Sequence, residues 1–465
     1  MRDLYGPRRR KDRQRSNMEL AAGRVRRRYE KGIAMRSFLG SLAWASVAAM
    51  TGALSAPAIA APVEVVVQYT QPQIFDKVFE KLKADFEAEN PNIKIKFRGP
   101  HKDYSAGFQG LLREATVGGM PHVDYVGLSF VPVLGERDIA VDLATLMKSD
   151  GSTFEKQGWI PSMQSIGQAG GKQYGLPFAV SMSLVYYNAD LVKKVGADPA
   201  NMPRDWDGLL QIAGKIKALG PDMSGMYIPY ASNWYGAWYF QGVLFGLGGE
   251  MMQPSAKTVA FDKDPHFQKA FELYRRMVDE GGLVPLADQA ARQQFIAGRM
   301  GLFIDSISRL NNFSTTVGER FTLGTSPHPL GAENGRLPTG GNVAIVTKEA
   351  AKNPEVLAAA WKWVKFSTGP QGTNQVIRQV GYTPVNVLAL EDPALLKGYF
   401  DTRPLHKTAV DQIPLVREWF AYPGPNAIKI DDVIGQNLEA VVGKTKTPEE
   451  ALVSLTKDVN ALLPR

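Results

Sequence analysis

Residues 174–206, with the sequence YGLPFAVSMSLVYYNADLVKKVGADPANMPRDW, decide the predicted fold. Two apolar runs predict two strands, but Ala179, Ser181 and Ser183 stand where one long core strand would continue with Val or Ile. Such a break suits a backbone that crosses between two lobes and lines the gap between them. A short helix and a turn bounded by prolines then lead into a longer helix that begins at Trp206.

This stretch resembles the crossover strand of the extracellular solute-binding proteins of ABC importers (family 1, carbohydrate type). In that family a Y-G-x-P-x-A run precedes a Y-N-x-D-L helix start, and the two motifs match Tyr174–Ala179 and Tyr187–Leu191. Two further segments resemble the family, Phe295–Phe303 with its F-x-x-G pattern and Gly381–Val385 with its G-Y-x-P-V pattern. The resemblance covers essentially all of the chain after residue 60.

The resemblance implies a type II periplasmic-binding fold, an α/β architecture of two lobes with hinge strands between them. One lobe is expected at 61–178 plus 340–385 and the other at 179–339 plus 386–465. The implied function is that of a non-catalytic receptor, without a cofactor, that closes on a small carbohydrate or related polyol or glycerol phosphate. It would deliver this ligand to the permease subunits of an ABC importer in the inner membrane. We expect a monomer.

The first part of the chain after residue 60 alternates strands and helices. The expected elements are strands at 63–69, 93–97 and 123–128, with helices near 74–86 and 103–117. This alternation predicts a mostly parallel sheet with helices on both faces, in which ligands bind beyond the carboxyl ends of the strands. Tyr69 and Ser129 lie at such ends and are candidate cleft residues.

Charge and cysteine content exclude several classes of protein. The 465 residues favour two domains, and their formal net charge is +8. Residues 1–60 carry 13 basic and 4 acidic side chains, so the remainder has a net charge of −1. The basic excess therefore gives no support to a nucleic-acid-binding protein. The absence of cysteine excludes disulfides, thiolate metal sites and cysteine nucleophiles.

Residues 1–60 have the pattern of a leader with a secretory signal peptide. A positive start at Met35-Arg36 precedes the apolar run 38–54 and the small-x-small pattern Ala58-Ile59-Ala60. Polar residues weaken the run, so cleavage after Ala60 is favoured over a membrane anchor. No cysteine follows the cleavage site, so we expect a periplasmic protein that is not a lipoprotein. The residues before Met35 are either an over-extended start or a long basic part of the signal.

A sugar needs aromatic faces for its C–H surfaces and hydrogen-bonding groups for its hydroxyls. Trp234 and Tyr235, in the most aromatic stretch of the chain, suit the first role, although they suit the core of a helix equally well. Candidates for the second role are polar residues or glycines near strand ends, namely Ser181, Asp305, Ser306, Gly340, Gly341 and Asn342. Each has a structural alternative. Ser181 could be a tolerated interlobe residue, Asp305-Ser306 could cap a helix, and Gly340-Gly341 could simply permit a turn.

Within the family, the chain resembles the glycerol-3-phosphate-binding members. Gly340-Gly341 is similar to their diglycine, Tyr382 lies in their G-Y-x-P motif, and Lys429 lies in the loop that bears their phosphate-binding arginine. Lysine in place of arginine replaces a bidentate fork by a point charge. Leu128-Ser129-Phe130 replaces an acidic residue of that group. A neutral sugar is therefore at least as well supported as a phosphodiester.

The common catalytic motifs do not occur in this chain. G-x-S-x-G, H-E-x-x-H, the P-loop and G-x-G-x-x-G are missing, and the five histidines lack metal-ligand spacing. We therefore predict neither catalytic residues nor a metal site. Acidic residues are plentiful, so the alternative is a secreted carbohydrate-active enzyme, a polysaccharide lyase or hydrolase.

Overall fold

The computed structural model describes residues 61–231, 234–253, 255–424 and 426–464, apart from the side chain of Trp234. The predicted leader and its cleavage site lie outside these residues. By their contacts, the residues from 61 onward belong to one unit. No helix within the described ranges combines the length and the apolar character that crossing a bilayer requires.

The first sheet has five strands in the order β2-β1-β3-β12-β6. Their bounds are β1 Val63–Gln68, β2 Ile93–Phe97, β3 Val123–Gly127, β6 Gly175–Ser181 and β12 Gly340–Val346. β1 pairs in parallel with β2 and β3, as the alternating sequence pattern predicts. β12 runs antiparallel to both β3 and β6. It enters the sheet from a distant part of the chain, so local alternation could not have revealed its direction.

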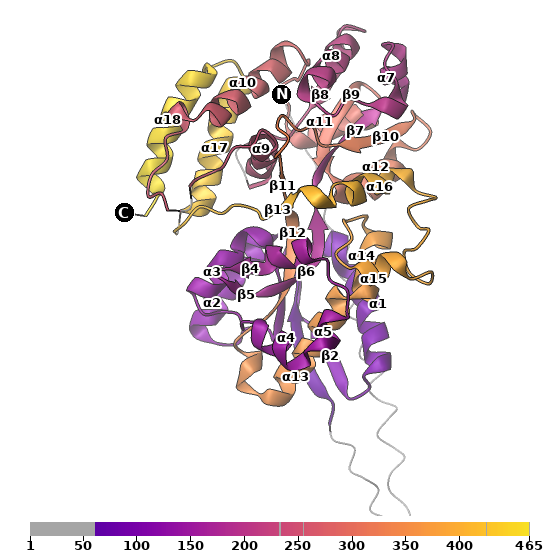
Figure 1. Cartoon of the computed structure of the whole chain (residues 1–465), viewed down its shortest axis with the longest axis vertical. Helices are drawn as coiled ribbons and strands as arrows, with labels where there is room; N and C mark the ends of the chain where they lie inside the picture. The colour runs from indigo at the N-terminus through magenta and orange to yellow at the C-terminus, as the bar shows by residue number, and fades with distance from the viewer. Residues whose placement is uncertain (1–60, 232–233, 254, 425, 465) are drawn as a thin grey trace, which may run out of the picture. The chain divides into compact units, whose positions relative to one another are not determined.

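Helices from both ends of the chain pack with the first sheet (Figure 1). The longer ones are α1 Pro72–Glu89, α2 Tyr104–Val117, α13 Pro354–Thr368 and α14 Pro370–Gln379, with the short α15 Val387–Glu391 after them. α1 buries Phe75, Phe79 and Phe86 on one face, and the Phe79 ring stacks on Phe178 at 5.1 Å between centroids. Residues of the segment 389–399 pack into this same core.

The second sheet has four strands in the order β10-β7-β9-β8. Their bounds are β7 Ser183–Asn188, β8 Ser224–Tyr227, β9 Met300–Ser306 and β10 Leu323–Pro327. β7 is antiparallel to β9 and β10, whereas β8 and β9 are parallel. The helices grouped with it in Figure 1 are α7 Ala189–Lys194, α8 Trp206–Lys217, α9 Trp234–Gly246, α10 Pro265–Asp279, α11 Asp288–Ile296, α12 Leu310–Val317, α16 Pro404–Asp411, α17 Ala427–Val442 and α18 Pro448–Leu462.

The backbone passes from the first sheet to the second through Met182, the single residue between β6 and β7. This confirms the two strands and the polar break that the sequence predicts. In the strand register, Ser181 lies opposite Gly340 and Ser183 lies opposite Ser306. The polar residues of the break therefore meet polar or glycine residues at the ends of neighbouring strands, where a ligand can approach them.

Hydrogen bonds hold this crossing from both sides. The Thr383 amide donates to the Val180 carbonyl at 2.8 Å, and the Ile307 amide donates to the Met182 carbonyl at 3.0 Å. Backbone groups of a buried crossing need such partners, because an unpaired buried amide or carbonyl is costly.

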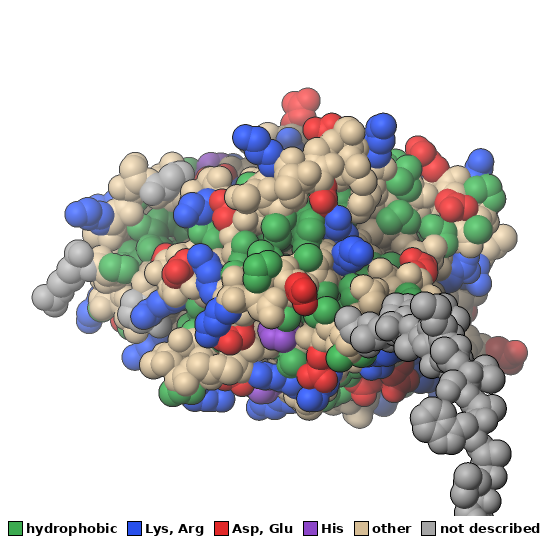
Figure 2. All heavy atoms as spheres, turned by 90° about the horizontal axis from the view of Figure 1, so that it is seen from below, with side chains coloured by type: hydrophobic (Ala, Val, Ile, Leu, Met, Phe, Trp, Pro, Cys, Tyr) green, Lys and Arg blue, Asp and Glu red, His purple; other side chains and the backbone are tan. Residues whose placement is uncertain are grey.

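The face of the molecule seen in Figure 2 carries lysine and arginine side chains interspersed with aspartate and glutamate. A nucleic-acid-binding face would gather basic side chains into a patch or stripe. The mixed charges on this face are consistent with the net charge of −1 after residue 60.

Candidate ligand-binding cleft

A cavity of about 290 Å³, here called the arginine cavity, is lined by residues from both sheets and their helices. On the side of the first sheet it is lined by Tyr104, Ser181, Gly340, Gly341 and Tyr382. On the side of the second it is lined by Tyr235, Trp238, Asp288, Arg292, Ser306, Arg309 and Trp419. Strand ends of two sheets thus meet around one space, as expected for a ligand crevice in α/β proteins.

Asp305, near the end of β9, binds polar side chains that line the arginine cavity. Its buried carboxylate accepts hydrogen bonds from the hydroxyls of Tyr235 and Tyr239, and it pairs with Arg292 Nε at 3.0 Å. The Ser306 amide donates to it at 2.7 Å. Burial alone would raise the pKa of Asp305, but the two nearby guanidinium groups and the tyrosine hydroxyls outweigh burial and lower it. Asp305 is therefore ionised and holds Tyr235 in place.

The two arginines of this cavity keep hydrogen-bonding capacity that the protein does not use. Arg292 Nη2 and Arg309 Nε are buried without a hydrogen-bond partner. Arg292 pairs with Asp305, whereas among the described residues Arg309 forms no ion pair. Asp288 also lines the cavity, and its carboxylate accepts a hydrogen bond from the Tyr227 hydroxyl at 2.8 Å. Unsatisfied guanidinium N–H groups beside a cavity favour a ligand with anionic or carbonyl oxygens.

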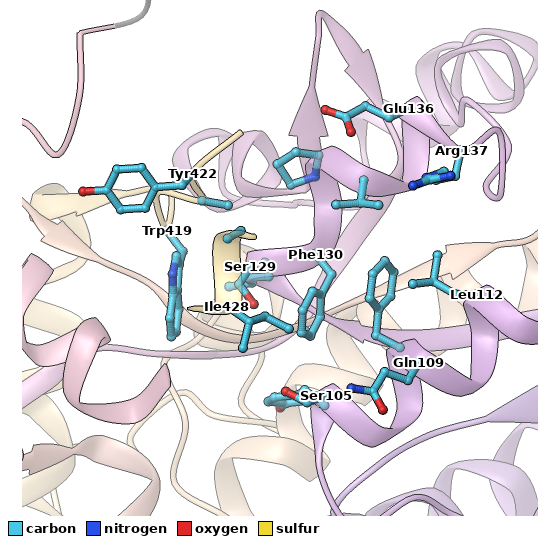
Figure 3. Close-up of a pocket in the computed structure, with 18 of the residues that line it drawn as sticks. Ser105, Gln109, Leu112, Ser129, Phe130, Glu136, Arg137, Trp419, Tyr422 and Ile428 are labelled. Atoms are coloured by element: carbon cyan, nitrogen blue, oxygen red, sulfur yellow. The ribbon is translucent and has the colours of Figure 1, made fainter. Parts of the chain in front are cut away.

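A larger cavity of about 770 Å³, here called the aromatic cavity, adjoins the first and shares Tyr104, Gly341 and Trp419 with it. Figure 3 shows Trp419 on one side of it and Phe130 on the other, with Ser129 and Ile428 between them. Phe130 is itself backed by Phe108, whose ring is stacked on it at 4.4 Å. Trp419 stacks on Trp238 at 6.2 Å, so one pair of indoles connects the two cavities. Flat rings of this kind suit the C–H faces of a sugar or polyol.

Gly341 lets the backbone of β12 pass close to β6 where the two cavities meet. Its φ is +112°, and a Cβ atom there would lie 1.8 Å from the Ala179 carbonyl oxygen. The strand register also shifts between Asn342 and Val343. Only glycine fits this position, because a side chain is excluded both by φ and by contact.

The structure brings most of the predicted site residues together. Six of them line the arginine cavity, namely Ser181, Tyr235, Ser306, Gly340, Gly341 and Tyr382. Ser129 lines the aromatic cavity. Asp305 supports the first group from beneath, and Asn342 Nδ2 donates to the Tyr104 hydroxyl at 3.0 Å. The side chain of Trp234 lies outside the described part of the chain.

Tyr69 and Lys429 lie elsewhere and line neither cavity. Tyr69 packs against Phe79, and its hydroxyl donates a hydrogen bond to Asp76 at 2.6 Å. Both partners belong to α1, so contacts with this helix hold the side chain that was expected to face a ligand. Lys429 is exposed on the first turn of α17, whereas its neighbour Ile428 lines the aromatic cavity.

The cleft residues that were not predicted from the sequence include Arg292, Arg309, Trp419 and Asp431. Arg309 follows the predicted Asp305-Ser306 pair by three residues, so extending that polar loop by one turn would have found it. Asp431 lies one helical turn after Ile428. Arg292 and Trp419 have no comparable local signal. The described residues contain no group of three acidic or histidine side chains placed to hold a metal ion.

A model of the bacterial extracellular solute-binding protein family matches residues 81–397. This chain belongs to that family. The family consists of binding proteins and not enzymes, so the family assignment does not support the alternative of a carbohydrate-active enzyme. Membership also agrees with an extracellular or periplasmic location.

This family member is similar over most of its length to two binding proteins. It is 26% identical over 392 residues to a binding protein of Brucella abortus (strain 2308), covering 83% of this chain and 90% of that protein. It is 25% identical over 407 residues to the sn-glycerol-3-phosphate-binding periplasmic protein UgpB of Escherichia coli (strain K12), with coverages of 84% and 90%.

Solved structures show the same fold. UgpB from Mycobacterium tuberculosis, in complex with glycerophosphocholine, has a TM-score of 0.73 at 21% identity, covering 86% of this chain and 98% of that one. The sugar-binding protein MalE of Xanthomonas citri has a TM-score of 0.73 at 19% identity, with coverages of 86% and 97%. The family member therefore has the two-lobed fold of periplasmic binding proteins.

Proposed function

We propose that this protein captures a carbohydrate or a related polyol or glycerol phosphate in the cleft formed by the two cavities. It then delivers the ligand to the permease subunits of an ABC importer. The observation that carries this proposal is the pair of adjoining cavities, which share Trp419, together with the unsatisfied guanidinium groups of Arg292 and Arg309 in the lining of one of them. The relatives named for glycerol 3-phosphate and for sugars support the same ligand classes.

We further propose that the two lobes correspond approximately to 61–178 plus 340–385 and to 179–339 plus 386–465, acting as a monomer in the periplasm after cleavage at Ala60. The division of the strands between two sheets supports the main boundaries. The packing of 389–399 with the first sheet favours moving the last boundary to about residue 400. Closure of the lobes would follow from tighter binding of the ligand to the closed form.

Ligand-dependent thermal unfolding tests this function. A ligand present at 100 times its Kd is expected to raise the free energy of unfolding by about 2.7 kcal/mol, because it binds only the folded protein. Calorimetry or dye-based melting with maltose, ribitol, sn-glycerol 3-phosphate and glycerophosphocholine gives the measurement.

Arg309→Gln is expected to reduce the melting shift with phosphates, since Arg309 lines the cavity without an ion pair among the residues described. Arg320→Gln, which changes an exposed arginine after α12, is the matched control and should leave the shift unchanged. A protein that no member of such a panel stabilises, or that turns over an oligosaccharide repeatedly, would contradict the proposed function.

A further inference from the structure

Gln241 is a polar side chain that is completely buried in α9 and lies in the lining of neither cavity. Its neighbours along the helix, Phe240, Val243 and Leu244, are equally buried and are apolar. A buried amide is costly unless its hydrogen bonds are satisfied, so an apolar side chain would be the ordinary choice in such a core. The reason for a glutamine at this position must therefore lie in the hydrogen bonds that it makes.

The side-chain amide of Gln241 binds the backbone of a single residue, Phe420, at both of its ends. Gln241 Nε2 donates to the Phe420 carbonyl at 2.9 Å, and the Phe420 amide donates to Gln241 Oε1 at 3.0 Å. The side chain thus pairs with Phe420 as a residue of a neighbouring strand does, and each amide satisfies the other. Since 179 residues separate the two along the chain, this pair holds a distant segment against α9.

The segment that Gln241 holds forms part of the wall of the cleft. Trp419 immediately precedes Phe420 and lines both cavities, and Ala421 immediately follows it and lines the aromatic cavity. Figure 3 shows the Trp419 indole at one side of the aromatic cavity. Gln241 therefore binds the backbone between two residues of the wall without facing the cavities itself.

Two further contacts hold Trp419 in this place. The Arg417 carbonyl, two residues earlier, accepts a hydrogen bond from the Thr339 amide at 3.0 Å. The Trp419 ring stacks on Trp238, with 6.2 Å between the ring centroids and 18° between the planes. Trp238 and Gln241 are three residues apart and hence on the same face of α9. This face of α9 supplies both the ring on which Trp419 stacks and the amide that holds the backbone next to it.

We propose that Gln241 is a positioning residue of the binding cleft. Its amide fixes the backbone of Phe420, so that the Trp419 indole stands where the two cavities meet before a ligand arrives. A wall that is already ordered binds a ligand more tightly, because the cost of ordering it does not fall on the binding step. This inference rests on the proposed function, since it names a residue that prepares the cleft for its ligand.

Fluorine NMR of the protein labelled with 5-fluorotryptophan tests the positioning without any ligand. The chain has eight tryptophans, and the Trp419 signal is identified by its loss in Trp419→Ala. Gln241→Met keeps an unbranched side chain of similar length but removes both hydrogen bonds to Phe420. It is expected to shift or broaden the Trp419 signal, because the backbone beside the indole is no longer fixed. An unchanged Trp419 signal in folded Gln241→Met would overturn the inference.

Gln173→Met is the matched control for this measurement. Gln173 is also buried, and its amide donates to the carbonyls of Gln164 and Gly175 at 3.0 and 2.7 Å, but it lines neither cavity. This substitution likewise removes two hydrogen bonds from a buried glutamine to the backbone. The Trp419 signal should nevertheless stay unchanged. A signal that moves equally in both variants would indicate general loosening of the fold and would overturn the role of Gln241.

Affinity shows whether the position of Trp419 matters for binding. Isothermal titration with maltose, ribitol, sn-glycerol 3-phosphate and glycerophosphocholine finds which of them the wild-type protein binds. Gln241→Met is expected to weaken the binding of that ligand about tenfold, whereas Gln173→Met should keep the wild-type affinity. In the Trp419→Ala background the Gln241 substitution should have little further effect, because both act through one contact.

Two results of the titrations would contradict the inference. An unchanged affinity in Gln241→Met would overturn the role of Gln241 in binding, even if the fluorine signal moves. Losses that simply add in the double variant would mean that Gln241 does not act through Trp419, and would overturn the inference as well.

Hydrogen exchange of the wild-type protein needs no variant and decides the matter if Gln241→Met does not fold. The Phe420 amide is expected to exchange at least about a hundredfold more slowly than in an unstructured peptide, because it donates to a buried oxygen. Exchange at the unprotected rate would overturn the inference. If the wild-type protein binds no ligand of the panel, the proposed function fails, whereas the fluorine and exchange measurements still decide whether Gln241 positions Trp419.

Discussion

Asp305→Ala is expected to lower the free energy of unfolding by about 3–5 kcal/mol, because it removes one partner of a buried ion pair. Asp305 is fully buried, and its loss would leave Arg292 without the carboxylate that its Nε contacts at 3.0 Å. The hydroxyls of Tyr235 and Tyr239 would lose their common acceptor at the same time. Denaturant unfolding followed by circular dichroism measures the change.

An exposed ion pair provides the control for this substitution. Asp279 pairs with Arg275 and Lys444 at the surface, with its side chain 44% exposed. Asp279→Ala should therefore cost at most about 1 kcal/mol, because water solvates the separated charges. Similar losses in the two variants would contradict the structural role assigned to Asp305.

The contribution of the Asp305 carboxylate should also be visible in the pH dependence of stability. The pKa of Asp305 is lowered in the folded protein, so its contribution to stability is complete above the ordinary aspartate pKa of about 4. This contribution is lost as the pH falls through the lower folded value. Wild type should therefore lose stability more steeply than Asp305→Asn below about pH 4.

Gly341→Ala is expected to destabilise the protein by about 3 kcal/mol or more and to abolish ligand binding. A φ of +112° is unfavourable for alanine, and the new Cβ atom would lie 1.8 Å from the Ala179 carbonyl oxygen. β12 would have to move away from β6, and the walls of both cavities would move with it. Unfolding curves and titration with the ligand found for wild type measure the two effects.

Gly118→Ala separates strain from contact. Gly118 follows α2 with a φ of +91°, but nothing lies within 4 Å of the position that its Cβ would take. The control should therefore lose only about 1–2 kcal/mol and retain binding. Equal losses at the two glycines would mean that the contact with Ala179 carries no cost.

The fold was predictable where the sequence pattern is local. The alternation along the first 70 residues after residue 60 predicted β1, β2, β3, α1 and α2, and the break at Ser181 predicted the passage from β6 to β7. The direction of β12 was not predictable in this way, because its neighbours β3 and β6 lie more than 150 residues earlier. Pairing between distant segments depends on tertiary packing, which periodicity does not encode.

The same distinction between local pattern and tertiary packing explains which residues of the candidate site could be predicted. Ser181, Ser306 and Gly340 were found because polar residues and glycines interrupt apolar strands at their ends. Tyr69 obeyed the same rule, but its hydroxyl is bound by Asp76 in the next helix. Lys429 shows how sensitive a helix is to register, because Ile428 one residue earlier lines the cavity and Lys429 does not. Trp419 lines the cleft because of the tertiary fold, and no local sequence pattern predicts its position there.

The passage through Met182 restricts where the molecule can bend. The Val180 carbonyl is tied to Thr383 beside the first sheet, and the Met182 carbonyl is tied to Ile307 beside the second. A change in the angle between the sheets must therefore be absorbed, at this connection, by torsions of the two peptide units between those anchors. Ser181, which borders the arginine cavity, belongs to this pivot. Contact with a solute and the swivel of one half against the other thus act on the same few bonds.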